Sequence, residues 1–208
     1  GADRQRVRIR AGARRHGMPV AEDILETDAA GQPLVERPDR DFADMAEAHA
    51  FGVPPGLGTC ADWSERLDAR LAYATMGIQA IKAVEIGLGK DVAARPGSAV
   101  HDPIRFDPAA VSTHTLGFAR DTNNAGGTEG GMSNGQPIVV RAAMKPISTL
   151  LRGLPSVDLN TKQPSEAGWE RSDISAIGAA SVVMENVIAF EIARAFLEKF
   201  GGDSMTEI

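Results

Sequence analysis

A glycine-dense stretch that leads directly into an apolar run constrains the fold of this chain more than any other feature. Five glycines fall between positions 126 and 135, and residues 137–144 then have the apolar character of a β-strand. Lys145 follows the strand, with Ser148 and Thr149 shortly after it. Glycine reaches backbone conformations closed to other residues and lets the backbone approach a ligand closely. The pattern predicts a tight loop and a strand with a cationic, hydroxyl-bearing end.

The charge around this loop leaves two interpretations open. No acidic residue occurs among the 28 residues between Glu129 and Asp158, which include Arg141, Lys145 and Arg152, although the chain has a formal net charge of −6. Successive free N–H groups beside a lysine would form an anion site, which suggests a phosphate-bearing ligand. The alternative is an ordinary turn between two strands. Neither the P-loop motif nor the G-x-G-x-x-G dinucleotide motif is present.

The overall composition excludes several classes of protein. A length of 208 residues with 43% hydrophobic and 24% charged residues is typical of one globular domain. No run approaches the ~20 apolar residues that span a bilayer, so we expect no membrane partner. The single cysteine, Cys60, cannot form an internal disulfide. The histidines lack metal-ligand spacing, so we expect no metal site; they are His16, His49, His101 and His114.

Six arginines within the first fifteen residues form a basic segment. Such a segment could contact nucleic acid, or it could be a solvated N-terminal arm. Because aromatic residues are absent from it and the rest of the chain is acidic, we expect an arm and no nucleic-acid partner.

Hydrophobic periodicity predicts the elements of the first half. Residues 41–50 are predicted as a short helix. Asp62 and Glu65 form a capping box that predicts the start of a second helix, ending near residues 79–82. A strand follows at residues 83–87, and the proline-containing residues 88–124 are predicted to be irregular connections. The apolar face of the second helix comprises Leu67, Leu71, Ala74 and Ile78.

A long helix is predicted near the C-terminus, over residues 179–200, with Gly201 and Gly202 as its stop signal. We expect the apolar residues at helical spacing to pack in the core; they are Val183, Val187, Phe190, Ala193, Leu197 and Phe200. Arg171, Ser172 and Asp173 precede this helix. Ser172 or Asp173 could cap it, or Asp173 could handle a proton while Arg171 binds an anion near the helix start.

Taken together, several segments resemble the C-terminal half of chorismate synthase in residue content, order and spacing. The resemblance runs from about residue 52 to the end, so we expect residues 1–51 to be a divergent or flexible segment and residues 52–208 to be one domain. The segments are GIQAIK at 77–82, VEIG at 84–87, GGMSNG at 130–135, RAAMKPIST at 141–149, RSD at 171–173 and LEKFGGDS at 197–204.

The resemblance implies an α+β fold in which antiparallel β-sheets form a layered sandwich around long helices, assembled as a cytoplasmic homotetramer. The implied reaction is the 1,4-anti elimination of phosphate from 5-enolpyruvylshikimate 3-phosphate, which gives chorismate and needs reduced FMN. The resemblance also implies a link to NADPH. The sequence leaves open whether the protein reduces the flavin itself or receives it reduced.

The resemblance assigns roles to particular residues of this chain. Asp173 is implied as the catalytic group that assists loss of the C6 proton. FMN contacts are implied at Gln79, Ala80, Gly130, Lys145, Pro146, Ile147, Ser148, Thr149 and Arg171.

Some features of the family have no counterpart here. The segments of its N-terminal half that carry two catalytic histidines do not occur in this chain, and His101 is not a substitute for them. Asn124 stands where the family usually has arginine, and Pro103 replaces an acidic residue. An alternative function is therefore that of a truncated, non-catalytic relative that retains the oligomer interface and flavin binding.

Overall fold

A five-stranded antiparallel sheet forms the centre of the computed structural model, which describes residues 8–15, 18–19, 44–148, 153–168 and 175–201. The strands lie in the order β2-β1-β3-β9-β4, and each neighbouring pair is antiparallel. Their bounds are Arg8–Arg15 for β1, Met18–Pro19 for β2, Asp44–Phe51 for β3, Ile81–Ile86 for β4 and Ile138–Met144 for β9.

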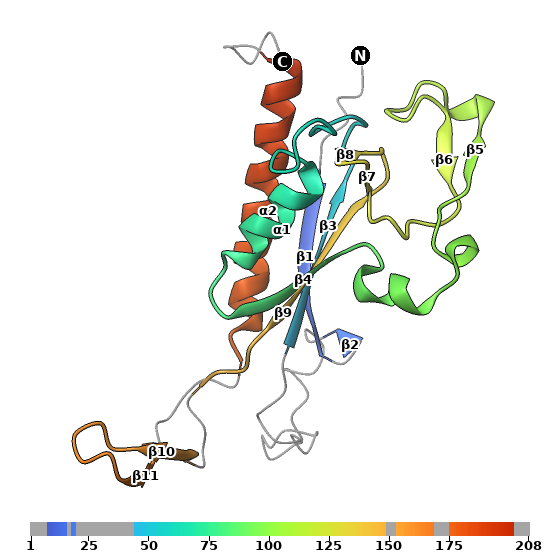
Figure 1. The fold of residues 1–208 in the computed structure, drawn as a ribbon. Helices are drawn as coiled ribbons and strands as arrows, with labels where there is room; N and C mark the ends of the chain where they lie inside the picture. The colour runs from blue at the N-terminus through green and yellow to red at the C-terminus, as the bar shows by residue number, and fades with distance from the viewer. Residues whose placement is uncertain (1–7, 16–17, 20–43, 149–152, 169–174, 202–208) are drawn as a thin grey trace, which may run out of the picture.

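Two helices, α1 (Leu67–Met76) and α2 (Ile177–Phe200), cover one face of this sheet (Figure 1). Side chains alternate between the two faces of a strand, and the residues of β3 that face the helices, Ala46, Ala48 and Ala50, are buried alanines. Small strand residues leave room for the larger side chains of the helices in a close-packed interior. The buried core includes Ala46, Ala48, Ala50, Leu67, Leu71, Ile138, Val140, Met184, Ile188 and Ile192.

The remaining elements are short and lie outside the main sheet. Three two-stranded hairpins occur among the described residues, together with three turns of 3₁₀ helix. The hairpins are β5 (Ile104–Phe106) with β6 (Phe118–Arg120), β7 (Thr128–Glu129) with β8 (Met132–Ser133), and β10 (Pro155–Val157) with β11 (Pro164–Glu166). The 3₁₀ turns are η1 (Gly89–Ala94), η2 (Gly97–Ala99) and η3 (Pro108–Ala110).

A buried arginine joins the two helices. Arg70 of α1 donates hydrogen bonds to Glu191, at 3.1 Å, and to Glu198, at 2.7 Å, both on α2. Burial alone would lower the pKa of Arg70, but the hydrogen bonds to Glu198 and Glu191 outweigh it and the pKa is raised. Removing one member of such a network leaves an uncompensated buried charge, so the network fixes how α1 lies against α2.

Most of the elements with strong periodicity are confirmed. The predicted strands at residues 83–87 and 137–144 are β4 and β9, and the predicted C-terminal helix is α2. The second helix is shorter than expected at both ends. Asp62 accepts a hydrogen bond from the Ser64 N–H in a turn that precedes α1, and Gly77 forms the C-cap, so the helix covers only Leu67–Met76.

The helix predicted at residues 41–50 is wrong, because this segment supplies strand β3. Alanine and glutamate favour helix intrinsically, but that preference amounts to less than about 1 kcal/mol per residue. The segment is paired along both edges, with β1 on one side and β9 on the other. These long-range pairings and the burial of Ala46, Ala48 and Ala50 outweigh the local preference.

The predicted core face of the C-terminal helix is also wrong. Val183, Phe190, Leu197 and Phe200 are exposed among the described residues. The side that packs on the sheet is a different one, because α2 is apolar on more than one side and spacing alone cannot identify the inner one. The buried residues of α2 are Ile177, Ala180, Ser181, Met184, Ile188, Ile192 and Ala195.

The α+β class is confirmed, with mixed helix and antiparallel sheet. Within the described residues, one sheet is covered by one layer of helices. No helix in this described part of the chain is long and apolar enough to cross a bilayer. The proposed division of the chain at residue 51 stays a prediction, and β3, which ends at that residue, is an inner strand of the sheet. The solvated arm expected for the arginine-rich segment is wrong for residues 8–15, because these residues form β1 and pair with β3.

Replacing an apolar side chain by alanine should change the free energy of unfolding differently on the two sides of α2. Ile188→Ala removes a side chain that is 1% exposed and should lower the free energy of unfolding by about 2–5 kcal/mol, because a core cavity is left. The matched control, Val182→Ala on the exposed side, should change it by no more than about 0.5 kcal/mol. Denaturant unfolding of the two variants checks this, and equal losses would contradict the assignment of the inner side.

Candidate functional site

Two loops that the sequence analysis singled out meet at one end of the sheet. Strand β9 ends at Met144, and the N–H of Lys145 donates to the carbonyl oxygen of Ala80 at 2.7 Å. Residues 79–80, which follow α1, therefore lie beside residues 145–148, which follow β9. We call these two segments the Lys145 junction. Gln79, Ala80, Lys145 and Ser148 are exposed there, and Pro146 and Ile147 are half-buried.

The backbone at this junction is held in an unusual conformation. Ala80 has a φ of 64°, in the left-handed region that a non-glycine residue occupies only at a cost of roughly 1–2 kcal/mol. The hydrogen bond from Lys145 fixes the Ala80 carbonyl, and the N–H of Ile81 bonds to Ile78 at 3.3 Å. Left-handed non-glycine residues persist where surrounding bonds determine them, and they cluster at ligand sites.

The chemistry of the Lys145 junction suits an anion. The ammonium group of Lys145 makes no hydrogen bond or ion pair with the described residues. Ser148 and Gln79, one on each segment of the junction, are exposed as well. A lysine binds phosphate as a compact positive charge, and hydroxyl and amide groups add hydrogen bonds. Of the predicted site residues, the structure brings together Gln79, Ala80, Lys145, Pro146, Ile147 and Ser148.

Gly130 lies away from this junction. It occupies the tip of the β7–β8 hairpin, where the next residue, Gly131, accepts a hydrogen bond from the N–H of Leu67 at the start of α1. Gln79 and Ala80 follow the other end of α1, a helix of 10 residues, so the two places are about 15 Å apart along its axis. The structure therefore separates Gly130 from the other described members of the predicted site.

The glycine run itself is largely structural. The N–H groups of Gly126 and Gly127 donate to the backbone and side-chain oxygens of Asn123, so they are not free to bind an anion. A Cβ at Gly126 would lie 2.3 Å from the Gly87 nitrogen, and one at Gly127 would lie 2.5 Å from the Pro137 oxygen. The turn interpretation holds for these two residues. Gly130 alone of the five glycines has open space around it.

Arg141 does not contribute a free charge to the expected cationic segment. Its Nε donates to Glu47 at 2.6 Å, and its Nη1 donates to the carbonyl oxygen of Gly87. Glu47 and Arg141 are direct partners in the β3–β9 register, a pairing between residues far apart in sequence. Arg141 therefore stabilises the sheet.

The rest of the predicted site lies outside the described residues. This holds for Thr149, Arg171 and Asp173, and for Arg152 of the expected cationic segment. Asp173 precedes the first residue of α2, Ile177, by four positions, and the Ile177 N–H donates to the Ser175 hydroxyl at 3.2 Å. No group of His, Cys, Asp and Glu side chains within the described residues could hold a metal ion.

One carboxylate that shapes the glycine run was not given a role by the sequence. Asp102 accepts hydrogen bonds from the N–H groups of Asn124, at 2.7 Å, and Ala125, at 2.9 Å, and from the Thr122 hydroxyl. Burial would raise the pKa of Asp102, but these hydrogen bonds outweigh it and lower the pKa. The sequence feature that could have found Asp102 is its place next to His101, because these two residues match a His-Asp pair of the family that the chain resembles. The exposed His101 plays no part in this arrangement.

The lowered pKa of Asp102 gives a stability prediction with a definite sign. The ionised Asp102 carboxylate contributes to the free energy of unfolding above its unfolded-state pKa of about 3.9. This contribution is lost as the pH falls through the lower pKa of the folded state. Asp102→Asn should lower the free energy of unfolding by about 1 kcal/mol at pH 7, and this difference should shrink near pH 3.

The control is Asp121→Asn, which breaks an exposed pair with Arg105 and should change stability by less than about 0.5 kcal/mol. Urea unfolding at the two pH values is the measurement. A difference between wild type and Asp102→Asn that stays constant from pH 7 to pH 3 would contradict the role of the ionised carboxylate.

Comparison with known proteins identifies the family. A family model described as chorismate synthase matches residues 43–197. The chorismate synthase of Geobacter metallireducens is 59% identical over 174 residues, which cover 81% of this chain and 44% of that protein. The chorismate synthase of Desulforudis audaxviator is 58% identical over 185 residues, which cover 86% of this chain and 46% of that protein.

A solved crystal structure of chorismate synthase gives the same result, with a TM-score of 0.64 and 46% identity over 80% of this chain and 41% of its own chain. The chain thus spans less than half the length of the relatives it matches. Because the match covers most of its residues at high identity, this chain belongs to the chorismate synthase family.

Proposed function

We propose that this chain supplies the flavin-binding and phosphate-binding part of an enzyme that converts 5-enolpyruvylshikimate 3-phosphate to chorismate by 1,4-anti elimination of phosphate. Membership of the family gives the class of enzyme, a lyase. The observation that carries the proposal for this chain is the Lys145 junction, where a fixed carbonyl at Ala80 and an exposed lysine meet.

The described residues of the junction fit a flavin mononucleotide. Its phosphate is an anion that the Lys145 ammonium and the Ser148 hydroxyl can hold, and the exposed Gln79 amide can bond polar atoms of the ligand. Reduced FMN, when bound, supplies the electron density that helps the substrate phosphate leave. The contacts proposed for Pro146, Ile147, Thr149 and Arg171 would extend the same site along the chain. Gly130 lies at the other end of α1, outside this junction, and its contact with FMN stays a separate prediction.

The chain's own residues would then position the substrate and move one proton. Fixed cationic groups aimed at a departing phosphate stabilise the charge that develops on it. Arg171 is the residue we assign to this task, in addition to its predicted contact with FMN. We assign to Asp173 the assistance in removing the C6 proton, a role that a carboxylate performs when it lies within hydrogen-bond reach of the proton. The link to NADPH, the homotetramer and the cytoplasmic location remain parts of this proposal.

Flavin binding should depend on Lys145. Lys145→Ala should weaken FMN binding about tenfold to a hundredfold, because a charge-assisted hydrogen bond to the phosphate is lost. Lys90→Ala is the matched control, since Lys90 is an exposed lysine of η1 and should leave the affinity unchanged. Quenching of flavin fluorescence during titration gives both affinities. Equal affinities for wild type and Lys145→Ala would remove Lys145 from the site.

The reaction itself is tested by anaerobic chorismate formation with chemically reduced FMN. Product from the chain alone would show that its residues suffice. Product only after addition of the unmatched part of the Geobacter metallireducens relative would show that the chain supplies one part of the site. Absence of product in both mixtures, with folded samples, would contradict the proposal.

The same assay tests Asp173. Asp173→Asn should lower turnover more than about a hundredfold while leaving FMN affinity nearly unchanged, because a proton-handling group is lost and no flavin contact is. Normal turnover by this variant would remove Asp173 from the catalytic assignment.

A further inference from the structure

Lys82 is the extra residue of a β-bulge at the start of β4. The register of β4 with β9 joins Ile81 to Met144 and then joins Ala83 to Ala143, so Lys82 has no partner of its own on β9. Two residues on one strand opposite one residue on its neighbour define a bulge, and bulges are common next to ligand sites, where they redirect a side chain. A role for this irregularity in ligand binding therefore has to be considered.

The burial of β4 shows what the bulge does to its side chains. Ile81 is 4% exposed, and farther along the strand Val84 and Ile86 pack against the core. Lys82 and Ala83, which lie between them, are both exposed. Regular alternation would return Ala83 to the side of Ile81. The extra residue thus leaves two successive side chains, Lys82 and Ala83, on the side of the sheet away from the helices.

The same side of the sheet carries Lys145 next to Lys82. Met144, the partner of Ile81, packs against the core, and the residue that follows it, Lys145, is exposed. Lys82 and Lys145 are diagonal neighbours across the two strands, a relation that places such residues roughly 7–8 Å apart. Because lysine side chains are long and flexible, both ammonium groups can reach one small ligand.

The backbone that presents Lys82 is fixed on both sides of Ile81. On one side lies the bulge, and on the other lies Ala80 with its left-handed φ of 64°. The Ala80 carbonyl oxygen is held by the N–H of Lys145, and the Ile81 side chain is held in the core. Conformations of this kind persist where the surroundings determine them, and they cluster at ligand sites. The position of Lys82 relative to Lys145 is therefore set by the fold.

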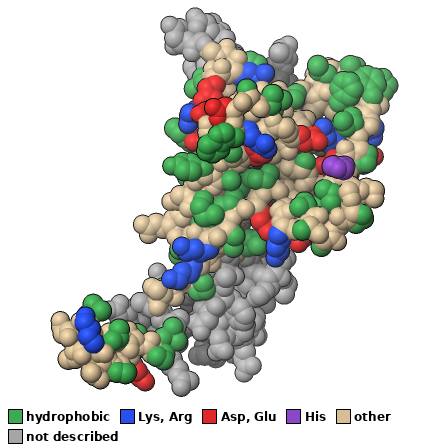
Figure 2. Space-filling view, viewed as in Figure 1, with side chains coloured by type: hydrophobic (Ala, Val, Ile, Leu, Met, Phe, Trp, Pro, Cys, Tyr) green, Lys and Arg blue, Asp and Glu red, His purple; other side chains and the backbone are tan. Residues whose placement is uncertain are grey.

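Neither lysine has an acidic partner among the described residues. The ammonium groups of Lys82 and Lys145 make no hydrogen bond or ion pair there. Two carboxylates on neighbouring stretches of the sheet bond elsewhere: Glu47 accepts from Arg141 at 2.6 Å, and Glu85 accepts from a backbone N–H of η1 at 3.4 Å. Figure 2 shows Lys and Arg side chains gathered at the lower end of the sheet, where β9 ends, apart from the Asp and Glu side chains of the visible face. Like charges so close together are destabilising unless an anion joins them.

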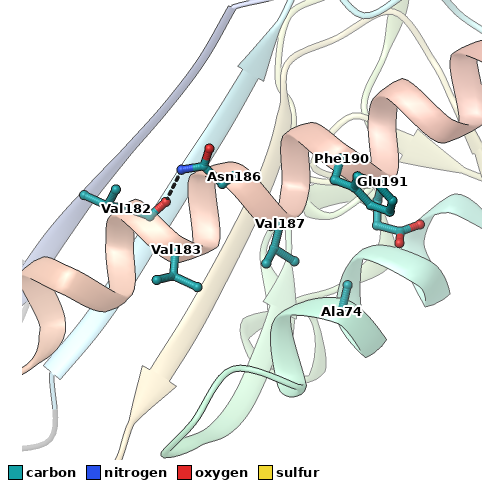
Figure 3. A pocket seen from close by; sticks show the side chains of 7 residues that line it. All are labelled: Ala74, Val182, Val183, Asn186, Val187, Phe190 and Glu191. Carbon is teal, nitrogen blue, oxygen red and sulfur yellow. Dashed lines mark hydrogen bonds between the residues drawn. The ribbon is translucent and has the colours of Figure 1, made fainter.

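The hollows between the two helices lack such a charge. Figure 3 shows one of them, of about 500 Å³, with Val183 and Val187 of α2 directed toward Ala74 of α1. The charged residue that lines it is acidic, Glu191. A second hollow, of about 710 Å³, reaches Gln79, and no Lys or Arg occurs among the described residues that line either hollow. A phosphate would find its counter-charges at the lysines and not between the helices.

We propose that Lys82, a residue to which the resemblance assigns no role, is a second contact for the phosphate of FMN, held between the ammonium groups of Lys82 and Lys145. A phosphate monoester carries a charge of roughly −1.5 to −2 at pH 7, which two ammonium groups neutralise. Lysine binds phosphate as a compact point charge, so two of them need no further geometry than closeness. The inference rests on the proposed function, because it takes the Lys145 junction as the flavin site.

Riboflavin, which has the flavin ring but not the phosphate, gives the test its specificity. Lys82→Ala should weaken FMN binding about tenfold and leave the affinity for riboflavin unchanged, because a contact to the phosphate alone is lost. Lys82→Arg should retain most of the FMN affinity. Lys90→Ala, on an exposed lysine of η1, is the matched control and should change neither affinity. Titrations of the full chain followed by flavin fluorescence give all these values, and circular dichroism checks the fold of each variant.

The outcomes separate this inference from the function on which it rests. Weaker FMN binding by Lys145→Ala but not by Lys82→Ala would overturn the role of Lys82 and leave the proposed function standing. Equal losses of FMN and riboflavin affinity in Lys82→Ala would also overturn it, because the bulge would then act on the fold and not on the phosphate. Absence of FMN binding to the wild-type chain, or FMN binding that neither lysine affects, would overturn both proposals.

Discussion

The pairing of β9 with strands on both of its edges is the constraint on which the rest of the structure depends. β3 lies along one edge and β4 along the other, and the inward side chains Ile138, Val140 and Ala142 are buried under the helices. Where β9 begins, the Val139 N–H bonds to Gly126 at 3.1 Å; just beyond its end, the Lys145 N–H bonds to Ala80 at 2.7 Å. One strand thus holds the glycine run and the Lys145 junction at opposite ends of the sheet.

The elements that could be predicted from the sequence are those with a strong local pattern. β9 and α2 are of this kind, because their apolar runs are long and end at clear stop signals such as Gly201. β3 could not be predicted in this way. Its residues favour helix locally, and it becomes a strand only because β1 and β9, distant in sequence, pair with it. The inner side of α2 could not be predicted for a different reason, since two of its sides are apolar and helical spacing alone does not identify the one that packs on the sheet.

The candidate site could also be predicted only in part. The resemblance named residues 79–80 and 145–148 together, and the bond between Lys145 and Ala80 joins these segments. The cationic segment expected from local charge was less reliable, because Arg141 forms an ion pair with Glu47, a residue 94 positions away in the sequence. No sequence signal indicated that the N–H groups of Gly126 and Gly127 would donate hydrogen bonds to Asn123. Spacing shows which residues share a motif, but only the fold shows which of them remain free for a ligand.

The central claim is that this chain binds FMN at the Lys145 junction, at the end of β9. Backbone amide chemical shifts of the ¹⁵N-labelled chain, recorded while FMN is added, test it most directly. We predict saturable shifts for the amides of Ala80, Lys145 and Ser148, with no change for Val157 on the β10–β11 hairpin. FMN that binds while these three amides stay unchanged, or no binding at all, would contradict the account.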